Sequence, residues 1–166
     1  MTTDDLILQA LRNSTLSDEL RDSEIDALAN LITVRDYKAG ESILKQSDNN
    51  QLNDALLILG SGEVEATATT GGEKVTLHLL KPGDLAGIIG FVGGSAMQIS
   101  ATVVAKTDSR VLLLDRARFE TLLNTQPAIV YYVMRGIVRH VHGIVRRMNM
   151  QSVQMSNYIF KQGGRY

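Results

Sequence analysis

The chain has 166 residues, a formal net charge of −1 and no cysteine. This length suits one domain with a hydrophobic core. The near-neutral charge argues against a strongly basic nucleic-acid-binding surface, and the missing cysteines exclude disulfides, thiolate metal sites and cysteine nucleophiles. The acidic start does not match a signal peptide, and no window approaches the roughly 18 apolar residues of a membrane span. We therefore expect one soluble, cytoplasmic domain over residues 1–166.

Residues 1–32 predict two helices. Asp4 and Asp5 precede an apolar run that begins at Leu6, and acidic residues are favourable at a helix N-terminus. A second helix follows, for which Ser17 or Ser23 is a candidate N-cap. We interpret both helices as packing against the outside of a sheet.

Residues 33–115 predict a β-roll. Short apolar runs separated by turn signals about every ten residues are typical of an antiparallel barrel or sandwich. Counting these runs gives about eight strands, enough to close a small barrel. The pair Gly71-Gly72 between residues 66–70 and 75–80 predicts a tight hairpin.

Residues 81–115 are the candidate functional centre. They begin with the turn Pro82-Gly83-Asp84, continue with the uncharged, glycine-rich residues 85–95, and end in two β-branched runs, 100–105 and 110–114. A glycine-rich bend between strands lets a ligand approach the backbone closely, because no Cβ stands in the way.

Residues 116–160 predict helices again, a short one over 116–124 with Asp115 as its cap and a long one that begins at Pro127. Gly136 and Gly143 weaken the long helix, which suggests that a partner helix or a ligand approaches there. Apolar residues spaced alternately four and three apart predict a dimer seam. The seam consists of Met134, Val138, Val141, Val145, Met148, Ser152, Met155 and Ile159. The alternative is a helix that lies along the β-roll of a monomer.

The order and spacing of these motifs resemble the cyclic-nucleotide-binding domain of the catabolite-activator (CRP/FNR) superfamily. The matching motifs are residues 37–41, 60–64, 79–84, 101–107, 111–115 with Phe119, and the long helix. The similarity runs from about Glu24 to Met150. It implies a mainly β fold, a jelly-roll or double-stranded β-helix barrel with N-terminal helices, a phosphate-binding cassette and a long C-terminal dimerisation helix.

In that family the cassette contains Phe-Gly-Glu and, some ten residues later, Arg-Ser/Thr-Ala. The Glu accepts a hydrogen bond from the ribose 2′-OH, and the Arg pairs with the cyclic phosphate. The corresponding triplets here are Ala86-Gly87-Ile88 and Ile99-Ser100-Ala101. Gly87, Ser100 and Ala101 match, whereas isoleucine replaces both charged anchors.

The resemblance implies cAMP or cGMP as the ligand, and the loss of both anchors points instead to an apolar or filled pocket. The expected cassette residues are Gly87, Ile88, Ile89, Gly90, Ile99, Ser100 and Ala101. The N–H groups of residues 87–90, at a short helix start, are candidate anion donors. Tyr131 and Arg135 of the long helix are candidates to cap the ligand.

Two functional interpretations remain open. The first is a dimeric regulatory module that senses an atypical effector, and the second is a ligand-free structural or protein-interaction dimer. A regulatory protein is a further expected partner. Direct DNA binding is not expected, because about sixteen residues follow Met150 and leave no room for a helix-turn-helix domain. No catalytic motif is present, and His140 and His142 are too close in sequence to face one another as metal ligands. We therefore expect no enzyme activity.

Overall fold

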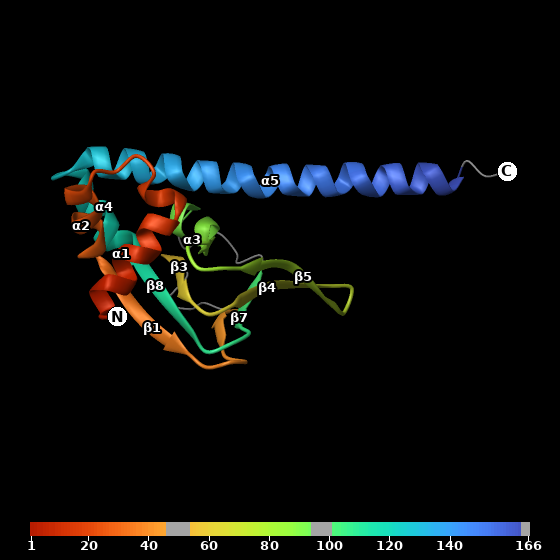
Figure 1. Cartoon of the computed structure of the whole chain (residues 1–166), viewed down its shortest axis with the longest axis horizontal. Coiled ribbons are helices and arrows are strands. Elements are labelled where there is room, and N and C mark those ends of the chain that lie inside the picture. The colour runs from red at the N-terminus through yellow and green to blue at the C-terminus, as the bar shows by residue number, and fades with distance from the viewer. Residues whose placement is uncertain (46–53, 94–100, 164–166) are drawn as a thin grey trace.

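The computed structural model describes residues 1–45, 54–93 and 101–163. Two four-stranded antiparallel sheets form a β-roll, helices cover one side of it, and one long helix extends well beyond it (Figure 1). The strand orders are β1-β8-β3-β6 and β2-β7-β4-β5. This confirms the predicted mainly β, jelly-roll architecture with flanking helices.

The strands are β1 (Ile32–Tyr37), β2 (Ser42–Leu44), β3 (Ala55–Ser61), β4 (Val64–Thr70), β5 (Glu73–Leu80), β6 (Leu85–Ala86), β7 (Thr102–Ala105) and β8 (Ser109–Asp115). The helices are α1 (Thr3–Asn13), α2 (Asp22–Ala29), α3 (Ile88–Gly93), α4 (Arg116–Glu120) and α5 (Pro127–Gly163), with 3₁₀ turns η1 (Thr15–Ser17) and η2 (Thr121–Leu123). None of these described helices combines the length and the apolarity that a membrane crossing needs.

The two inner strands of the first sheet, β3 and β8, are buried on both faces, because they are apolar at nearly every position. Alternate side chains on a strand point to opposite faces, so each strand contributes to two cores. Leu57, Leu59, Val111 and Leu113 belong to the core between the sheets. Leu56, Ile58, Leu112 and Leu114 belong to the larger core under the helices. The register pairs Leu56 with Leu114 and Leu57 with Leu113, which keeps the two sets on opposite faces.

The predicted Gly71-Gly72 hairpin is confirmed. Thr70 pairs with Glu73, and the two glycines between them have φ values of 61° and 85°. Positive φ at both central residues matches the twist of a two-residue hairpin, which is why glycine suits both positions.

The acidic start of α1 is confirmed, and its cap is Thr2. The Thr2 hydroxyl accepts from the Asp5 N–H at 3.1 Å, while the Asp5 carboxylate accepts from the Thr2 N–H at 3.0 Å. The proposed caps of the second helix were wrong. The Ser17 hydroxyl instead donates to the Leu11 carbonyl at 2.7 Å, and Ser23 lies inside α2. The N-cap position of α2 is Arg21, whose N–H donates to the Glu24 carboxylate at 2.8 Å.

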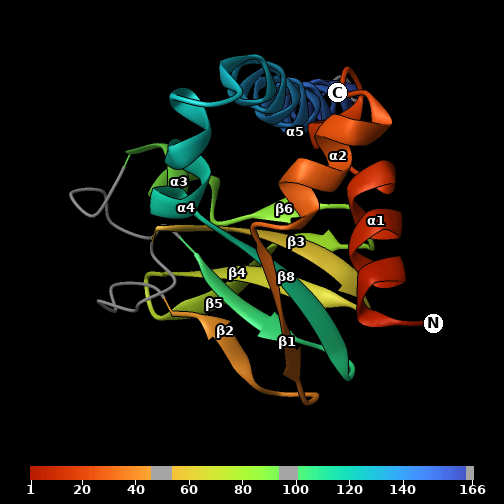
Figure 2. The same cartoon turned by 90° about the vertical axis from the view of Figure 1, so that its left-hand side faces the viewer.

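The C-terminal helices begin where the sequence predicts. Asp115 caps α4 by accepting from the Arg118 N–H at 3.0 Å, and Pro127 begins α5. The short helix expected over 116–124 divides into α4 and η2. Figure 2, a view along α5, shows this helix above the first sheet, with α1 and α2 on one side and α3 and α4 on the other.

Candidate ligand-binding site

Gly87 fixes the backbone conformation at the start of the expected cassette. It follows β6, has a φ of 73°, and its carbonyl accepts from the Phe91 N–H at 3.1 Å as α3 begins. A Cβ at this position would lie 2.9 Å from both the Ala55 carbonyl oxygen and the Leu57 Cδ1 on β3. Both the backbone conformation and the contact with β3 therefore require glycine.

The next residues divide between the core and the surface. Ile88 is half-buried and packs against the core under the helices, and Phe91 is buried with its ring centroid 5.5 Å from that of Phe119. Gly90 is buried, whereas Ile89 is exposed. Ile88, where the resemblance places the family's glutamate, thus supports α3 by packing.

The second half of the cassette is described only from Ala101 onward. Ala101 is half-buried and leads into β7, while Ile99 and Ser100 lie outside the described residues. The sequence contains no Lys or Arg from residue 85 to residue 105, so the cassette segment has no cation of its own for a phosphate.

Tyr131 and Arg135, the candidate caps, lie together on α5. The Arg135 guanidinium donates to the Tyr131 hydroxyl at 3.2 Å and lies 5.6 Å from the centre of its ring. The Arg135 Nε also lies 3.1 Å from the Glu19 carboxylate. Arg139, one turn later, pairs with Glu19 and lies 3.4 Å from Asp18. These ion pairs direct both arginines toward the segment after η1. No contact described in the structure joins Arg135 to residues 87–90, the expected start of the cassette.

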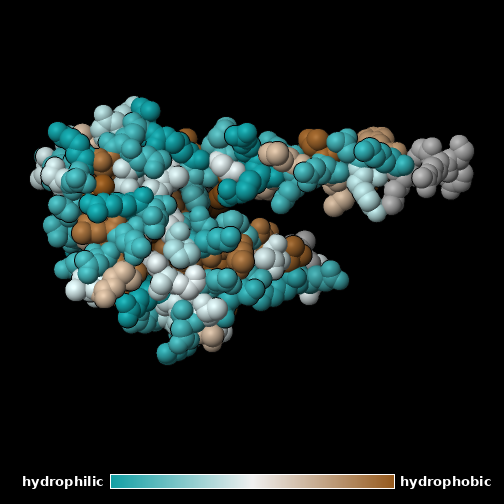
Figure 3. Space-filling view, in the orientation of Figure 1, coloured by the Kyte–Doolittle hydropathy of each residue, from teal (hydrophilic) through white to brown (hydrophobic). Residues whose placement is uncertain are grey.

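The apolar residues of α5 divide between two surfaces. Ile129, Val133 and Ile137 are buried against the β-roll and its helices. Of the seam residues, Met134 is half-buried against the same core, and the others are exposed. Figure 3 shows apolar patches along the projecting part of α5. The seam beyond Met134 is therefore free to contact a second surface.

The two glycines of α5 have different surroundings. A Cβ on Gly136 would collide with the Thr15 carbonyl oxygen and lie 2.9 Å from the Leu16 Cα. The close approach expected at this glycine is thus made by η1 of the same chain. A Cβ on Gly143 would meet only the Arg147 Nη1, at 3.9 Å.

Residues 34–126 match the family described as cyclic nucleotide-binding domain. The chain belongs to this family. It is 30% identical to the cyclic AMP receptor protein of Thermus thermophilus over 132 residues, which are 79% of this chain and 59% of that protein.

Solved structures of cyclic nucleotide-binding domains agree with the fold. The Thermus thermophilus catabolite activator protein superposes with a TM-score of 0.69 and 28% identity, over 84% of this chain and 63% of that one. A cyclic nucleotide-binding domain from Methylobacillus flagellatus KT gives a TM-score of 0.79 at 19% identity, over 92% and 83%. The chain is accordingly a regulatory domain of the cyclic nucleotide-binding type, related to catabolite activators.

Several relatives are much longer than this cyclic nucleotide-binding domain. The chain spans 59% and 48% of the first two curated relatives, the second being the HTH-type transcriptional regulator Cmr of Mycobacterium tuberculosis. The neuropathy target esterase sws of Drosophila virilis is 24% identical over 98% of this chain but only 11% of its own length. The likeness to the esterase thus concerns a small part of that protein.

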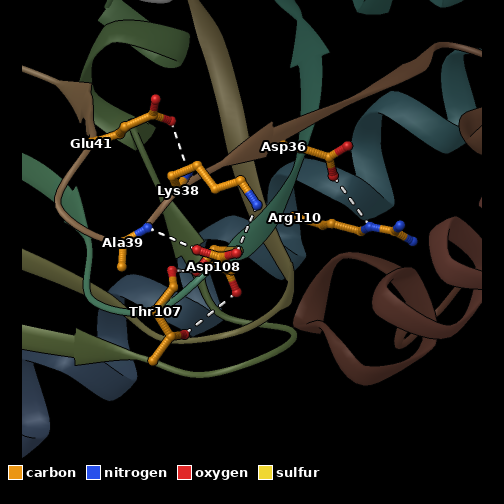
Figure 4. A network of polar contacts seen from close by, with 8 residues as sticks. Asp36, Lys38, Ala39, Glu41, Thr107, Asp108 and Arg110 are labelled. Atoms are coloured by element: carbon orange, nitrogen blue, oxygen red, sulfur yellow. Dashed lines mark hydrogen bonds and ion pairs between the residues drawn. The ribbon is translucent and has the colours of Figure 1, made fainter.

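The motif at residues 37–41, one of those that carry the resemblance, is fixed by a polar network at the end of the β-roll (Figure 4). The Lys38 ammonium lies 2.8 Å from the Asp108 carboxylate, which also accepts from the Ala39 N–H at 3.0 Å. Glu41 accepts from the Lys38 N–H at 2.7 Å. Both the Lys38 ammonium and the Ala39 N–H lower the pKa of Asp108. This network joins two turns and has a structural role.

Sequence reasoning missed two groups of side chains around α5. Asp18 and Glu19 pair with its arginines, and nothing in their local sequence indicates this contact. His140 is buried, whereas His142 is exposed. The burial of His140 could have been found, because it follows Val133 and Ile137 at the helical spacing of the buried face.

Proposed function

We propose that this cyclic nucleotide-binding domain is a dimeric sensor of an atypical effector, in which the cassette controls the position of α5. The observation that carries the proposal is the combination of Gly87 and Ile88. Gly87 keeps the tight, left-handed entry to the cassette, while Ile88 places a packed hydrocarbon where the family has a carboxylate. The backbone conformation of the site is thus kept, while the polar groups that would bind a nucleotide are replaced by apolar ones.

The missing anchors argue against ordinary cAMP or cGMP as the effector. A hydrogen bond to a charged group contributes on the order of 1.5–3 kcal/mol, so each lost anchor lowers affinity about tenfold to a hundredfold or more. Ile88 and Ile99 in their places favour a ligand with more apolar surface and less charge. The expected contacts remain residues 87–90, Ile99, Ser100 and Ala101.

A connected apolar core supports communication between the cassette and α5. Ile88 and Phe91 of α3 belong to the same cluster as Ile129, Val133 and Ile137 of α5. A ligand that displaces α3 would therefore change the packing under α5. It shifts α5 only if it binds two arrangements of this core with different affinities.

In this proposal the chain dimerises through the exposed seam, and the dimer transmits the effect of the ligand to a partner protein. Val138, Val141 and Val145 are 65%, 39% and 47% exposed, and Met148 and Met155 are exposed as well. Their heptad spacing matches a two-helix interface better than a solvated surface. A change in the position of α5 would then alter the arrangement of the two chains in the dimer, and with it the surface that a regulatory protein partner binds.

Restoring the two anchors tests the proposal. The double variant Ile88→Glu, Ile99→Arg should gain measurable affinity for cAMP or cGMP by isothermal titration calorimetry, whereas the native chain binds either nucleotide weakly or not at all. The matched control is Ile89→Glu with Ile99→Arg, because Ile89 is the exposed neighbour of Ile88. Tight binding of cAMP by the native chain would contradict an atypical effector.

The second candidate is a dimer that has lost its ligand and acts in protein interaction, and the packing of Ile88 against the core favours it. Native mass spectrometry of the protein from its own cells separates the two candidates. A retained small molecule supports sensing. A bare dimer that cAMP, cGMP, cyclic dinucleotides and apolar metabolites all fail to stabilise in thermal-shift assays supports the structural role.

A further inference from the structure

The projecting part of α5 carries a second row of apolar side chains, separate from the seam. Met150, Val153 and Phe160 are 56%, 58% and 79% exposed. At the 3.6 residues per turn of an α-helix, this row lies roughly a third of the circumference away from the seam. With two polar residues it repeats at alternating spacings of four and three, as the seam does. The resulting outer row consists of Arg146, Met150, Val153, Asn157 and Phe160.

The outer row stays exposed when two helices pair through the seam, because a two-helix coiled coil covers only one such face of each helix. An open hollow of about 400 Å³ follows this face and is lined in part by Arg146, Met150 and Val153. Figure 3 shows apolar patches on the upper side of the projecting part, away from the β-roll. The outer row is therefore an apolar surface that the seam leaves uncovered.

The charged side chains of α5 all have one sign. Residues 127–163 contain four arginines and one lysine and neither Asp nor Glu, although the whole chain has a net charge of −1. The first two arginines pair with carboxylates beside η1. Arg146, Arg147 and Lys161 form no ion pair with any residue that the structure describes. Within the described residues, the outer row thus has a cation without a carboxylate partner near each end.

Charge and polarity decide what can cover the outer row. A second copy of this face would bring further cations against Arg146 and Lys161, and like charges repel. A lipid surface would bury the Asn157 amide in hydrocarbon, where it finds no hydrogen-bond partner. A protein helix with apolar residues at matching spacing can cover the row, bond to the amide, and pair its own carboxylates with the cations.

We propose that the outer row binds an amphipathic, acidic helix of a partner protein. Apolar residues of that helix pack on Met150, Val153 and Phe160, and its carboxylates pair with Arg146 and Lys161. The inference rests on the proposed dimer only in that the seam leaves the outer row free. It gives the regulatory partner of that dimer a chemistry and a position on the chain.

A designed peptide tests this surface on the full chain. The probe is a fluorescein-labelled helical peptide of about 20 residues, long enough to populate a helix, with one leucine stripe and glutamates elsewhere. Its charge-reversed counterpart has lysine in place of each glutamate. Fluorescence anisotropy should show saturable binding of the glutamate peptide and at least about tenfold weaker binding of the lysine peptide. No binding of the glutamate peptide, or equal binding of both, would overturn the proposal.

Two substitutions that add the same charge locate the binding surface. Val153→Glu in the outer row should weaken binding of the glutamate peptide about tenfold or more. Gln151→Glu is the matched control, because residues two apart on a helix do not share a face, and it should leave binding nearly unchanged. Arg146→Glu should weaken the glutamate peptide and strengthen the lysine peptide. Equal effects of Val153→Glu and Gln151→Glu would contradict the assignment.

Light scattering of the same variants separates this proposal from the dimer. Val153→Glu should keep the mass of the native chain, because Val153 lies outside the seam. A mass that falls in this variant would place the outer row between copies of the chain and overturn the proposal. A native monomer that still prefers the glutamate peptide would contradict the dimer and support the outer row as a binding surface.

Vesicles of phosphatidylserine and phosphatidylcholine test the membrane as an occupant. The native chain should not sediment with them. Sedimentation that Val153→Glu abolishes and Gln151→Glu does not would assign the outer row to a lipid surface and overturn the proposal.

Discussion

At the scale of single residues, Gly87 fixes the backbone where the resemblance places the family's cassette. The left-handed backbone and the contact with β3 leave no room for a side chain, so the chain enters α3 in one direction. The following position carries no such backbone constraint, and there Ile88 packs against the core under the helices.

Substitution of Gly87 should reveal both constraints. Gly87→Ala is expected to lower the free energy of unfolding by about 2–4 kcal/mol, because a strained φ adds to a clash with the Ala55 carbonyl. Gly40→Ala is the matched control, since Gly40 has a φ of 89° but an added Cβ there would have no atom within 4 Å. The control should lose only about 1 kcal/mol. Urea denaturation measures both, and equal losses would show that the contact with β3 contributes nothing.

The Lys38–Asp108 ion pair should make the stability of the fold depend on pH. Its lowered pKa means that Asp108 stabilises the fold above its ordinary value of 3.8 and loses this contribution as the pH falls through the lowered pKa. Lys38→Met should raise the pKa of Asp108 toward 3.8, as carboxyl-carbon NMR titration would show. Lys106→Met, at another exposed lysine nearby, is the control and should leave the titration unchanged.

At the scale of elements, the two glycines of α5 should respond in opposite directions. Gly136→Ala forces the helix away from η1 and should cost about 1–3 kcal/mol of stability, as overpacking does. Gly143→Ala meets open space and should stabilise the helix by up to about 1 kcal/mol. Chemical denaturation of the two variants side by side measures the difference. A loss of stability in Gly143→Ala would instead show that a partner approaches this turn.

The elements that sequence could predict are those with strong local signals. Gly71-Gly72 defined a hairpin and Pro127 a helix start, because both depend on backbone preferences of the residues themselves. The two-residue strand β6 was missed, because it is held by pairing with β3 rather than by its own sequence.

The candidate site could be predicted only in part, because some of its contacts join segments that are distant in the sequence. The motif around Gly87 indicated a tight bend, and the structure explains it by the proximity of β3. The pairing of Arg135 and Arg139 with Glu19 arises from contacts between distant segments. Ile99 and Ser100 lie outside the described residues, so their role in the cassette stays a prediction.

At the scale of the whole molecule, dimerisation can be tested on the exposed seam without disturbing the body. Val145→Glu places a charge in the proposed interface and should halve the mass measured by light scattering. Gln154→Glu adds the same charge to another exposed position of α5 and should leave the mass unchanged. Truncation before Met148 should also give a monomer, and an unchanged mass in Val145→Glu and in the truncated chain would exclude the seam as the interface.

The attachment of α5 only along its first turns gives the helix the mechanics of a lever. The part beyond the buried His140, residues 141–163, is roughly 35 Å long at the rise of an α-helix. A tilt of about 10° at His140 would carry the far end through about 6 Å, a distance comparable with one helical turn. Small changes of packing where α5 leaves the β-roll would thus become sideways displacements large enough to change how two partner helices meet.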